Sequence, residues 1–304
     1  MTGVPAFFTD AQARVERALD QATSGQYDGP PVVRDAMRYT LLAPSKRVRA
    51  ILTTIACDLC GGPSTALRAG PGGAAETGGG AMSAAVAIEM VHASSLILDD
   101  LPSMDDAPMR RGRPSCHVQY GEAVATLAAF GLLSDAFGLL AWAYAPPLAR
   151  ELTMLLASAI GGDGLIAGQA EDLLATDTSI DFETLERIHR RKTGALFSAA
   201  ATAGAWVAGA RDDRVRALQA YAKNLGLAFQ IVDDLLDVTG DPNATGKATL
   251  ADARKTTFVS FSGVEGAREL AAELCRTADA SLEPFGARAA PLLELSAFVA
   301  DRRL

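Results

Sequence analysis

The sequence predicts an all-α fold, and three observations support that class. Alanine and leucine dominate the composition, runs of β-branched residues are rare, and apolar residues recur at the spacing of helix faces. A chain of 304 residues with 49% hydrophobic content can also bury a large core. This length suits one large domain or two, and we expect a single domain over residues 1–304.

The expected helices follow from capping residues and from breaks at proline and glycine. Thr9 is the predicted N-cap of a first helix that runs to about Ser24, and a second helix covers Pro31 to about Leu42. Residues 61–80 are rich in glycine and predict a flexible loop rather than a domain boundary. Further helices are expected at Ala81–Leu98, Val118–Tyr144, Leu148–Ile160 and Phe182–Ala203, and within Gly263–Leu304.

Carboxylates and guanidinium groups crowd into the stretch DDLPSMDDAPMRRGR, which begins at Asp99. Pro102 lacks a backbone N–H and disfavours helical geometry in the residue before it, so the preceding apolar helix must end near Leu101. Asp99 and Asp100 then lie at the negative end of the helix dipole, which is unfavourable unless a cation binds there. Asp105, returned by the Pro102 turn, is a candidate third ligand. The alternative for an isolated aspartate pair is a solvated acidic loop.

A second acidic cluster argues against a solvated loop. Asp233, Asp234 and Asp237 lie in FQIVDDLLDVTGD, where an apolar helical pattern continues on both sides of the acids. Because Asp233 and Asp237 are four residues apart, they share a helix face and repel each other in the free protein. Two such patches at the ends of apolar helices predict one cation site between facing helices.

Two basic motifs accompany the acids. Lys46 and Arg49 open a helix, where positive charge opposes the dipole unless an anion lies close by; a surface basic patch is an equal alternative. Lys192 and Thr193 lie midway along an apolar helix and are followed by Gly194. This lysine should face an anion or the acid cluster, unless its ammonium group extends to solvent. The Thr-Gly pair predicts a helix kink that frees a carbonyl.

Three further residues fit the same site. His92 precedes Asp99 by seven residues and so lies on roughly the same helix face, although a lone histidine on an apolar helix is usually a core residue. Lys247 and Lys255 follow the second acidic cluster. These cations suit a polyanion that metal ions hold on one side and ammonium or guanidinium groups hold on the other, and a diphosphate fits that arrangement.

Charge and hydropathy exclude several classes of protein. The net charge of −8, with no basic stripe, argues against a nucleic-acid partner. The first residues carry no basic segment followed by an apolar one, so we expect no secretory signal and a cytoplasmic location. The apolar run Ala81–Leu98 contains Glu89 and His92 and is expected as a buried helix, with no transmembrane segment. The four cysteines are expected to be reduced.

Together these motifs resemble the trans-isoprenyl diphosphate synthase family, and in particular its bacterial geranylgeranyl diphosphate synthases. DDLPSMD matches the longer DDxxxxD form of the first aspartate-rich motif and is followed by RRGRP, while DDLLD matches the second motif. Lys46, Arg49, His92, GQAEDL, KTG and the two late lysines also match, so the resemblance covers about Pro44 to Thr257. Each motif is moderately specific, and all of them in this order are very specific.

The resemblance implies a bundle of helices around a deep central cavity, with the two acid motifs facing each other across its mouth. It implies three Mg²⁺ ions per active site, for which Mn²⁺ can substitute. The implied metal ligands are Asp99, Asp100, Asp105, Asp233, Asp234 and Asp237. The implied contacts of the allylic diphosphate are Arg110, Lys192, Lys247 and Lys255. Those of isopentenyl diphosphate are Lys46, Arg49, His92 and Arg111.

The implied reaction condenses isopentenyl diphosphate with an allylic diphosphate, either farnesyl diphosphate or a shorter primer. Cleavage of the allylic carbon–oxygen bond leaves an anion that Mg²⁺ and fixed cations stabilise inside a cavity. The carbocation faces the Thr193 carbonyl and the Gln230 amide, and the leaving diphosphate accepts the proton. The implied catalytic residues are Asp99, Asp105, Asp233, Lys192, Thr193 and Gln230.

Product length should follow from the depth of the cavity. Ser94 and Ser95 stand where family members that stop at the fifteen-carbon product commonly carry an aromatic residue. Met90 and Val91, one turn deeper, are the expected floor, unless side chains from the segment 123–137 supply it instead. The expected product is therefore geranylgeranyl diphosphate.

Other readings remain open at this point. A farnesyl diphosphate synthase differs only in product length, and a class I terpene cyclase or head-to-head synthase has no need of cations for isopentenyl diphosphate. A non-catalytic subunit that modulates a partner synthase usually lacks one aspartate motif, whereas both are intact here. The resemblance also implies a homodimer.

Overall fold

The structure is a computed structural model that describes residues 6–25, 28–62, 80–239 and 255–300. Its described elements are α1 (Ala6–Thr23), α2 (Pro31–Leu41), α3 (Val48–Cys60), α4 (Met82–Asp99), β1 (Met109–Arg110), β2 (Arg113–Pro114), α5 (Cys116–Tyr120), α6 (Glu122–Ala143), α7 (Pro146–Ile160), α8 (Leu165–Ala175), α9 (Phe182–His189), η2 (Arg190–Gly194), α10 (Ala195–Val207), α11 (Asp212–Thr239), α13 (Phe258–Ala280), η3 (Glu283–Ala289) and α14 (Ala290–Ala300). The all-α prediction is confirmed.

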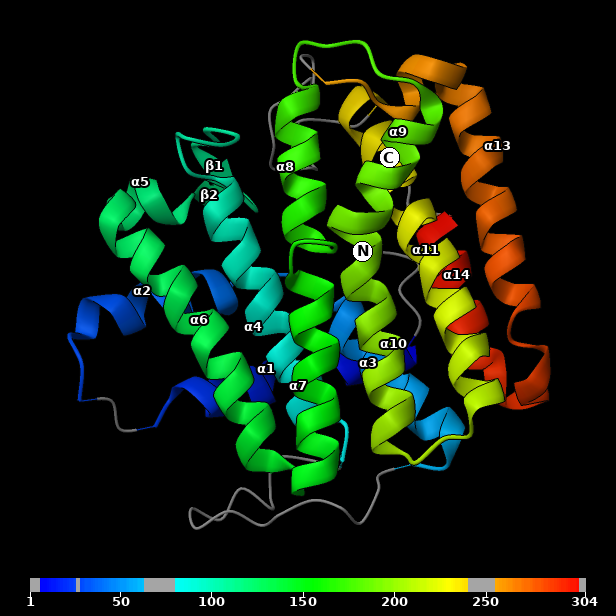
Figure 1. The fold of residues 1–304 in the computed structure, drawn as a ribbon, viewed down its shortest axis with the longest axis horizontal. Coiled ribbons are helices and arrows are strands. Elements are labelled where there is room, and N and C mark those ends of the chain that lie inside the picture. Colours follow the sequence, from blue (N-terminus) through cyan, green and yellow to red (C-terminus); the bar gives the residue numbers. More distant parts are fainter. Residues whose placement is uncertain (1–5, 26–27, 63–79, 240–254, 301–304) are drawn as a thin grey trace.

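The long helices stand side by side as a bundle (Figure 1). Helix α4 packs against α6, α3 and α10, and α10 in turn packs against α3, α7 and α11. Helix α13 covers the outer side of α11. Because α4 and α10 are apolar on nearly every face, they form the centre of the bundle. One apolar core extends from Phe8 in α1 to Val299 in α14.

Glycine allows close helix contacts at two positions. A Cβ on Gly204 of α10 would lie 2.1 Å from the carbonyl oxygen of Thr53 in α3. A Cβ on Gly168 of α8 would lie 2.3 Å from the backbone nitrogen of Lys192. The second contact seats the GQAEDL segment directly against the backbone of the KTG segment, and any larger residue at Gly168 would separate them.

Several element boundaries differ from those expected. Thr9 is not an N-cap, because α1 begins earlier, at Ala6. The helix expected over Val118–Tyr144 is two helices, α5 and α6, broken at Gly121, whose φ of 83° favours glycine. The segment after the first acidic motif forms the short hairpin β1–β2, a small exception to the all-α prediction. Most of the glycine-rich stretch 61–80 lies outside the described residues.

Two helices are long and apolar enough to span a membrane by length and composition. They are α4 and α6, which pack against each other in the bundle. Helix α4 is mostly buried, as expected for a core helix, whereas only a third of the α6 window is buried. All four cysteines are buried free thiols, which agrees with the expectation of reduced cysteines.

Candidate functional site

The first acidic motif lies where α4 ends. Asp99 is the last residue of the helix and Asp100 caps it, as Pro102 predicts. The chain then turns back, because the N–H of Asp105 donates to the Asp99 carbonyl at 2.9 Å and the N–H of Ala107 donates to the Asp100 carbonyl at 3.2 Å. The turn therefore returns Asp105 to the helix end, as expected.

The surroundings of Asp99 disfavour the ionised form of its carboxyl group. Burial raises its pKa from 3.8 to about 6; the positive charge of Lys192 lowers the pKa, and the neighbouring Asp105 raises it further. The negative end of the α4 dipole acts in the same direction as burial. A bound cation would remove this cost, so the position favours a metal ligand over a purely structural acid.

Asp100 is held inside the fold by Arg110. The Arg110 guanidinium donates to both carboxylate oxygens, with Nε at 2.9 and 3.2 Å, and Nη2 makes a further short contact. Asp100 is 2% exposed, and burial opposes the charge on Arg110, yet the hydrogen bond and charge of Asp100 outweigh burial and raise the Arg110 pKa. This pair fixes the hairpin to the end of α4.

The hairpin β1–β2 presents the arginines of the RRGRP segment. Arg110 pairs with Arg113 across it, and the two turn residues, Arg111 and Gly112, have φ values of 55° and 76°. Positive φ at both turn residues is typical of a type I′ turn, whose twist matches that of the strands. The Arg113 guanidinium stacks 3.9 Å from the ring centroid of Tyr39, so α2 anchors the hairpin from below.

The second acidic motif lies in the last two turns of α11, which runs to Thr239, so these acids too lie near a helix end, as expected. No proline or glycine lies between Asp233 and Thr239, so the helix continues past the acids. Asp234 is 4% exposed; its Oδ1 accepts from Gln230 Nε2 at 3.0 Å and its Oδ2 accepts from the Phe258 N–H at 3.1 Å. Asp233 lies near Arg49: burial lowers the Arg49 pKa, and the charges of Glu89 and Asp233 oppose that fall.

A polar chain connects the π-helical segment η2 to the second motif. The Thr193 hydroxyl donates to Gln230 Oε1 at 3.0 Å, and Gln230 in turn donates to Asp234. The five residues Arg190–Gly194 form a π-helical turn between α9 and α10. This is the helix irregularity that the Thr-Gly pair predicted, and such turns recur at functional sites.

One acid that the sequence analysis did not assign joins two of the expected cations. Asp172 Oδ2 accepts from Lys192 Nζ at 2.7 Å and from Lys255 Nζ at 2.9 Å. Lys255 also donates to Asp105 Oδ1 at 2.9 Å, so residues 105, 172, 192 and 255 form one network. Burial alone would raise the Asp172 pKa, but both lysines outweigh it and lower the pKa. The sequence signal was the interruption of an apolar pattern by GQAEDL.

Arg49, His92 and Arg111 form a second group, in which the two guanidinium groups repel each other. Arg49 Nη1 lies 3.3 Å from His92 Nε2, and Arg49 also stacks on Phe197. Burial, and then the charge of Arg49, lower the His92 pKa well below its usual value, so this ring is neutral and can accept a hydrogen bond. Burial and, after it, the charge of Arg47 lower the Arg111 pKa to about 10. Such crowding favours a bound anion.

Two neighbouring basic residues have different surroundings. Lys46 is exposed and lies 5.5 Å from the ring centroid of Phe298. Arg47 is buried and structural: its Nε donates to Glu16 at 2.7 Å, and its Nη1 lies 3.4 Å from the buried Glu89. The hydrophilic sequence of this segment did not reveal which of its cations is part of the core.

One expected site residue, and the predicted metal site as a whole, remain to be described. Lys247 lies outside the described residues. Within the part of the chain that the structure describes, no three acidic, histidine or cysteine side chains converge closely enough to hold a metal ion by themselves. The carboxylates therefore share a region without forming a closed cage.

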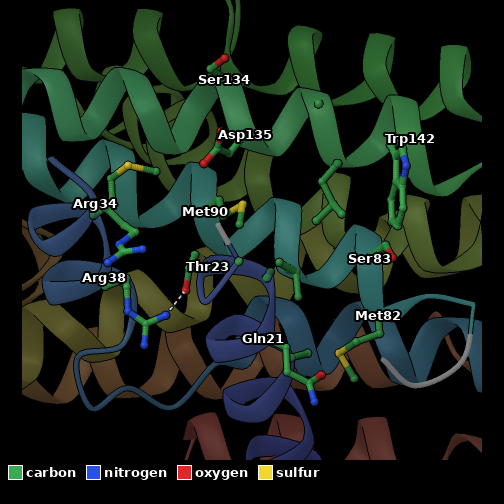
Figure 2. Close-up of a pocket in the computed structure, with 17 residues that line it drawn as sticks. Gln21, Thr23, Arg34, Arg38, Met82, Ser83, Met90, Ser134, Asp135 and Trp142 are labelled. Atoms are coloured by element: carbon green, nitrogen blue, oxygen red, sulfur yellow. Dashed lines mark hydrogen bonds between the residues drawn. The ribbon is translucent and has the colours of Figure 1, made fainter. Parts of the chain in front are cut away.

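The residues expected to set product length lie along α4. The Ser94 hydroxyl donates to the carbonyl of Ala129 in α6 at 2.8 Å, and the Ser95 hydroxyl donates to the His92 carbonyl at 2.9 Å. Met90 and Val91 are both 2% exposed. Met90 also lines a cavity between α1, α2, α4 and α6 (Figure 2). Small hydroxyl residues therefore occupy the helix turn that separates the acids from Met90.

An all-helical bundle whose paired aspartates, lysines and arginines face a shared polar region defines a class of enzymes that act on diphosphates in the presence of divalent metal ions. Residues 30–279 match the family described as Polyprenyl synthetase. The chain belongs to this family and is a trans-prenyltransferase by class.

Known relatives are similar in sequence to nearly the whole chain. Geranylgeranyl pyrophosphate synthase from Capsicum annuum is 42% identical over 303 residues, covering 97% of this chain and 78% of that protein. Geranylgeranyl pyrophosphate synthase 11 from Arabidopsis thaliana is 42% identical over 90% of this chain and 75% of that protein. Both relatives are named as chloroplastic, so the expected cytoplasmic location gains no support from them.

Two solved structures resemble the fold closely. The geranyltransferase from Helicobacter pylori, complexed with magnesium and isoprenyl diphosphate, has a TM-score of 0.82 at 31% identity and covers 97% of this chain and 95% of that one. The geranyltransferase from Legionella pneumophila has a TM-score of 0.82 at 32% identity, with 97% and 96% coverage.

Proposed function

We propose that this chain condenses isopentenyl diphosphate with an allylic diphosphate to give geranylgeranyl diphosphate. The main support for the proposal is that the basic side chains near the acids form two separate groups. Lys255 donates to Asp105 directly and shares Asp172 with Lys192, whereas Arg49 and Arg111 lie beside His92. Two separate cation groups suit two diphosphate substrates, and the relatives named geranylgeranyl pyrophosphate synthases support this product.

The residues present fit divalent magnesium. Carboxylate oxygens are the ligands that Mg²⁺ prefers, and the raised pKa of Asp99 marks a buried acid whose charge requires compensation. We assign direct ligation to Asp99, Asp105, Asp233 and Asp237, with further ligands supplied by substrate phosphates and water. The resemblance also implies Asp100 and Asp234 as ligands; because they hydrogen-bond Arg110 and Gln230, we assign them to positioning those side chains. When bound, the metal neutralises charge on the leaving diphosphate.

The side chains divide the chemistry between them. Arg110, Lys192, Lys255 and Lys247 hold the allylic diphosphate and stabilise the negative charge that develops as the carbon–oxygen bond breaks. The Thr193 carbonyl, at the π-helical turn, and the Gln230 amide oxygen stabilise the carbocation by their dipoles.

The second substrate attacks that carbocation. Lys46, Arg49, His92 and Arg111 hold isopentenyl diphosphate with its double bond next to the cation. The new carbon–carbon bond forms from the electrons of this double bond, and loss of a proton to the released diphosphate restores a double bond in the product. Water excluded by the surrounding helices cannot capture the cation.

Product length is set by α4. Because Ser94 and Ser95 are small, the growing chain extends past them until it meets Met90 and Val91. The test is chromatographic: purified protein with Mg²⁺, isopentenyl diphosphate and geranyl or farnesyl diphosphate should give the twenty-carbon product. Ser94→Phe should shorten it to fifteen carbons, with Ser94→Ala as the matched control. A fifteen-carbon product from the unaltered chain would identify a farnesyl diphosphate synthase instead.

The same assay separates the remaining alternatives. A terpene cyclase or head-to-head synthase would consume allylic diphosphate and leave isopentenyl diphosphate unchanged. A non-catalytic subunit would consume neither substrate when assayed alone.

A homodimer is also proposed, and helix α6 supports it. Leu127 and Phe130 are 56% and 61% exposed, and both lie on a helix that is apolar on nearly all faces. Large exposed apolar residues at helical spacing are typical of protein interfaces. Sedimentation analysis should give twice the chain mass, and Leu127→Glu combined with Phe130→Glu should give the monomer mass.

A further inference from the structure

A second cavity, separate from the acid motifs, opens at the surface of the bundle. It has a volume of about 610 Å³ and is lined by residues of α1, α2, α4 and α6 (Figure 2). Met82, Val86 and Met90 recur every fourth residue of α4, so they lie on one face and form an apolar floor about 12 Å long. Its volume falls within the usual range of small-molecule sites.

The two ends of this cavity differ in character. Arg34 and Arg38 of α2 lie together at one end, and Met82 and Trp142 lie at the other (Figure 2). Arg34 Nε is buried and has no hydrogen-bond partner among the described residues. Arg38 donates to Thr23 Oγ1 at 2.7 Å and forms an ion pair with Asp20 at 2.5 Å. A buried guanidinium N–H without a partner is costly, and an anionic ligand would remove that cost.

One acid also lines the cavity. Asp135 of α6 lies among the lining residues, and burial raises its pKa. Its negative charge opposes any anion bound nearby. An anionic head group is therefore best placed against Arg34 and Arg38, with an apolar chain along the α4 floor.

We propose that this cavity is a second binding site for a long-chain prenyl diphosphate, distinct from the catalytic site. The diphosphate contacts Arg34 and Arg38, and the isoprenoid chain lies over Val86 and Met90 toward Trp142. The inference rests on the proposed function, since that reaction supplies such an amphiphile as its product. Met90, the expected floor of the catalytic cavity, lines this cavity as well. A ligand bound here would therefore contact the same helix, α4, that sets product length.

Tryptophan fluorescence tests the site directly. The chain has two tryptophans, and Trp206→Phe leaves Trp142, which lines the cavity, as the only one. With EDTA present to remove the metal ions that the catalytic site requires, geranylgeranyl diphosphate should change the Trp142 emission saturably. Inorganic diphosphate, which lacks the chain, should not. Absence of a saturable change with geranylgeranyl diphosphate would overturn the proposal.

Matched variants locate the head group. In this background Arg34→Gln should weaken binding about tenfold or more, because a charge-assisted hydrogen bond is lost. Arg17→Gln, which removes the same charge from the exposed side of α1, should change it less than about twofold. Asp135→Asn should tighten binding. Equal affinity in Arg34→Gln and Arg17→Gln would contradict the assignment.

Two further measurements separate the possible outcomes. Palmitate carries an apolar chain with a single negative charge, and it should bind more weakly than the prenyl diphosphate; equal binding would overturn the assignment to a diphosphate. Prenyl transfer is measured on the same preparations. Turnover without a Trp142 response overturns only this second site, whereas absence of turnover overturns the proposed function.

Discussion

The two aspartate motifs look alike in sequence but are built differently. The first lies partly beyond the end of α4 and depends on a turn to return Asp105, whereas all three acids of the second lie on one helix, α11. They nevertheless share one arrangement. In each pair of adjacent aspartates the second, Asp100 or Asp234, is buried and hydrogen-bonded inside the fold.

The first aspartate of each pair lies among charges that belong to the site. The charges of Lys192 and Asp105 shift the pKa of Asp99, and the charge of Asp233 influences the pKa of Arg49. Adjacent residues on a helix point in directions about 100° apart, so one of the two can ligate metal while the other supports the scaffold. We therefore expect the two identical neighbours of each pair to have different roles, the first in metal ligation and the second in stability.

The largest effect is expected on activity from the first aspartate of each pair. Asp99→Ala and Asp233→Ala should each lower kcat by about 100-fold or more, because each removes charge that stabilises the metal–diphosphate group. Steady-state assays with isopentenyl and farnesyl diphosphates measure this. Near-normal kcat in either variant would contradict the proposal that the first aspartate of both motifs stabilises the metal–diphosphate group.

The second aspartates should instead affect stability. Asp100→Ala leaves Arg110 without its buried partner, and unfolding free energy should fall by about 3 kcal/mol. Asp234→Ala leaves the Phe258 N–H and the Gln230 amide without an acceptor, at a cost of about 2 kcal/mol. Urea denaturation measures the unfolding free energy of both variants and of Asp99→Ala for comparison. Equal stability loss in all three would show that the roles are not divided.

Asp172 should show an intermediate effect, since it touches both lysines of the diphosphate clamp. Asp172→Asn removes the charge that holds Lys192 and Lys255 together, and KM for the allylic substrate should rise about tenfold. KM for isopentenyl diphosphate should stay within about twofold, because that substrate is assigned to other cations. A rise in both KM values would indicate a general loss of structure.

The smallest effect concerns pH and thermal stability without metal. The Asp99 pKa is about 6 in the folded protein against an ordinary 3.8, so the folded state binds more protons than the unfolded state between these values. Wild-type stability therefore falls as pH rises from 4 to 6 and stays lower above that. In EDTA, Asp99→Asn should have a Tm about 3 °C above wild type at pH 7.5, and the difference should vanish near pH 4. A pH-independent difference would contradict the burial argument.

Local sequence rules predicted much of the fold and part of the site. Pro102 alone fixes where α4 ends and why Asp105 returns, and the Thr193-Gly194 pair predicted an irregular helix where η2 lies. These features depend on residues close together in the chain, so propensity and turn chemistry determine them.

Contacts between distant residues could not be predicted in this way. Asp172 meets Lys255 across 83 positions, and Arg47 becomes a core residue only because Glu89 is buried beside it. The separation of Asp100 from Asp99 likewise depends on Arg110, which the hairpin places after the chain has folded back. Charge patterns showed that these groups belong near one another, but only tertiary structure determines which group pairs with which.

The position of bound metal tests the central claim most directly. Crystals grown with Mn²⁺ and an unreactive allylic diphosphate analogue would locate the ions by anomalous scattering. The account predicts peaks ligated by Asp99 and Asp105 on one side and by Asp233 on the other, with the analogue's diphosphate between them and Asp100 still paired with Arg110. Peaks elsewhere, or a diphosphate that contacts neither Lys192 nor Lys255, would contradict it.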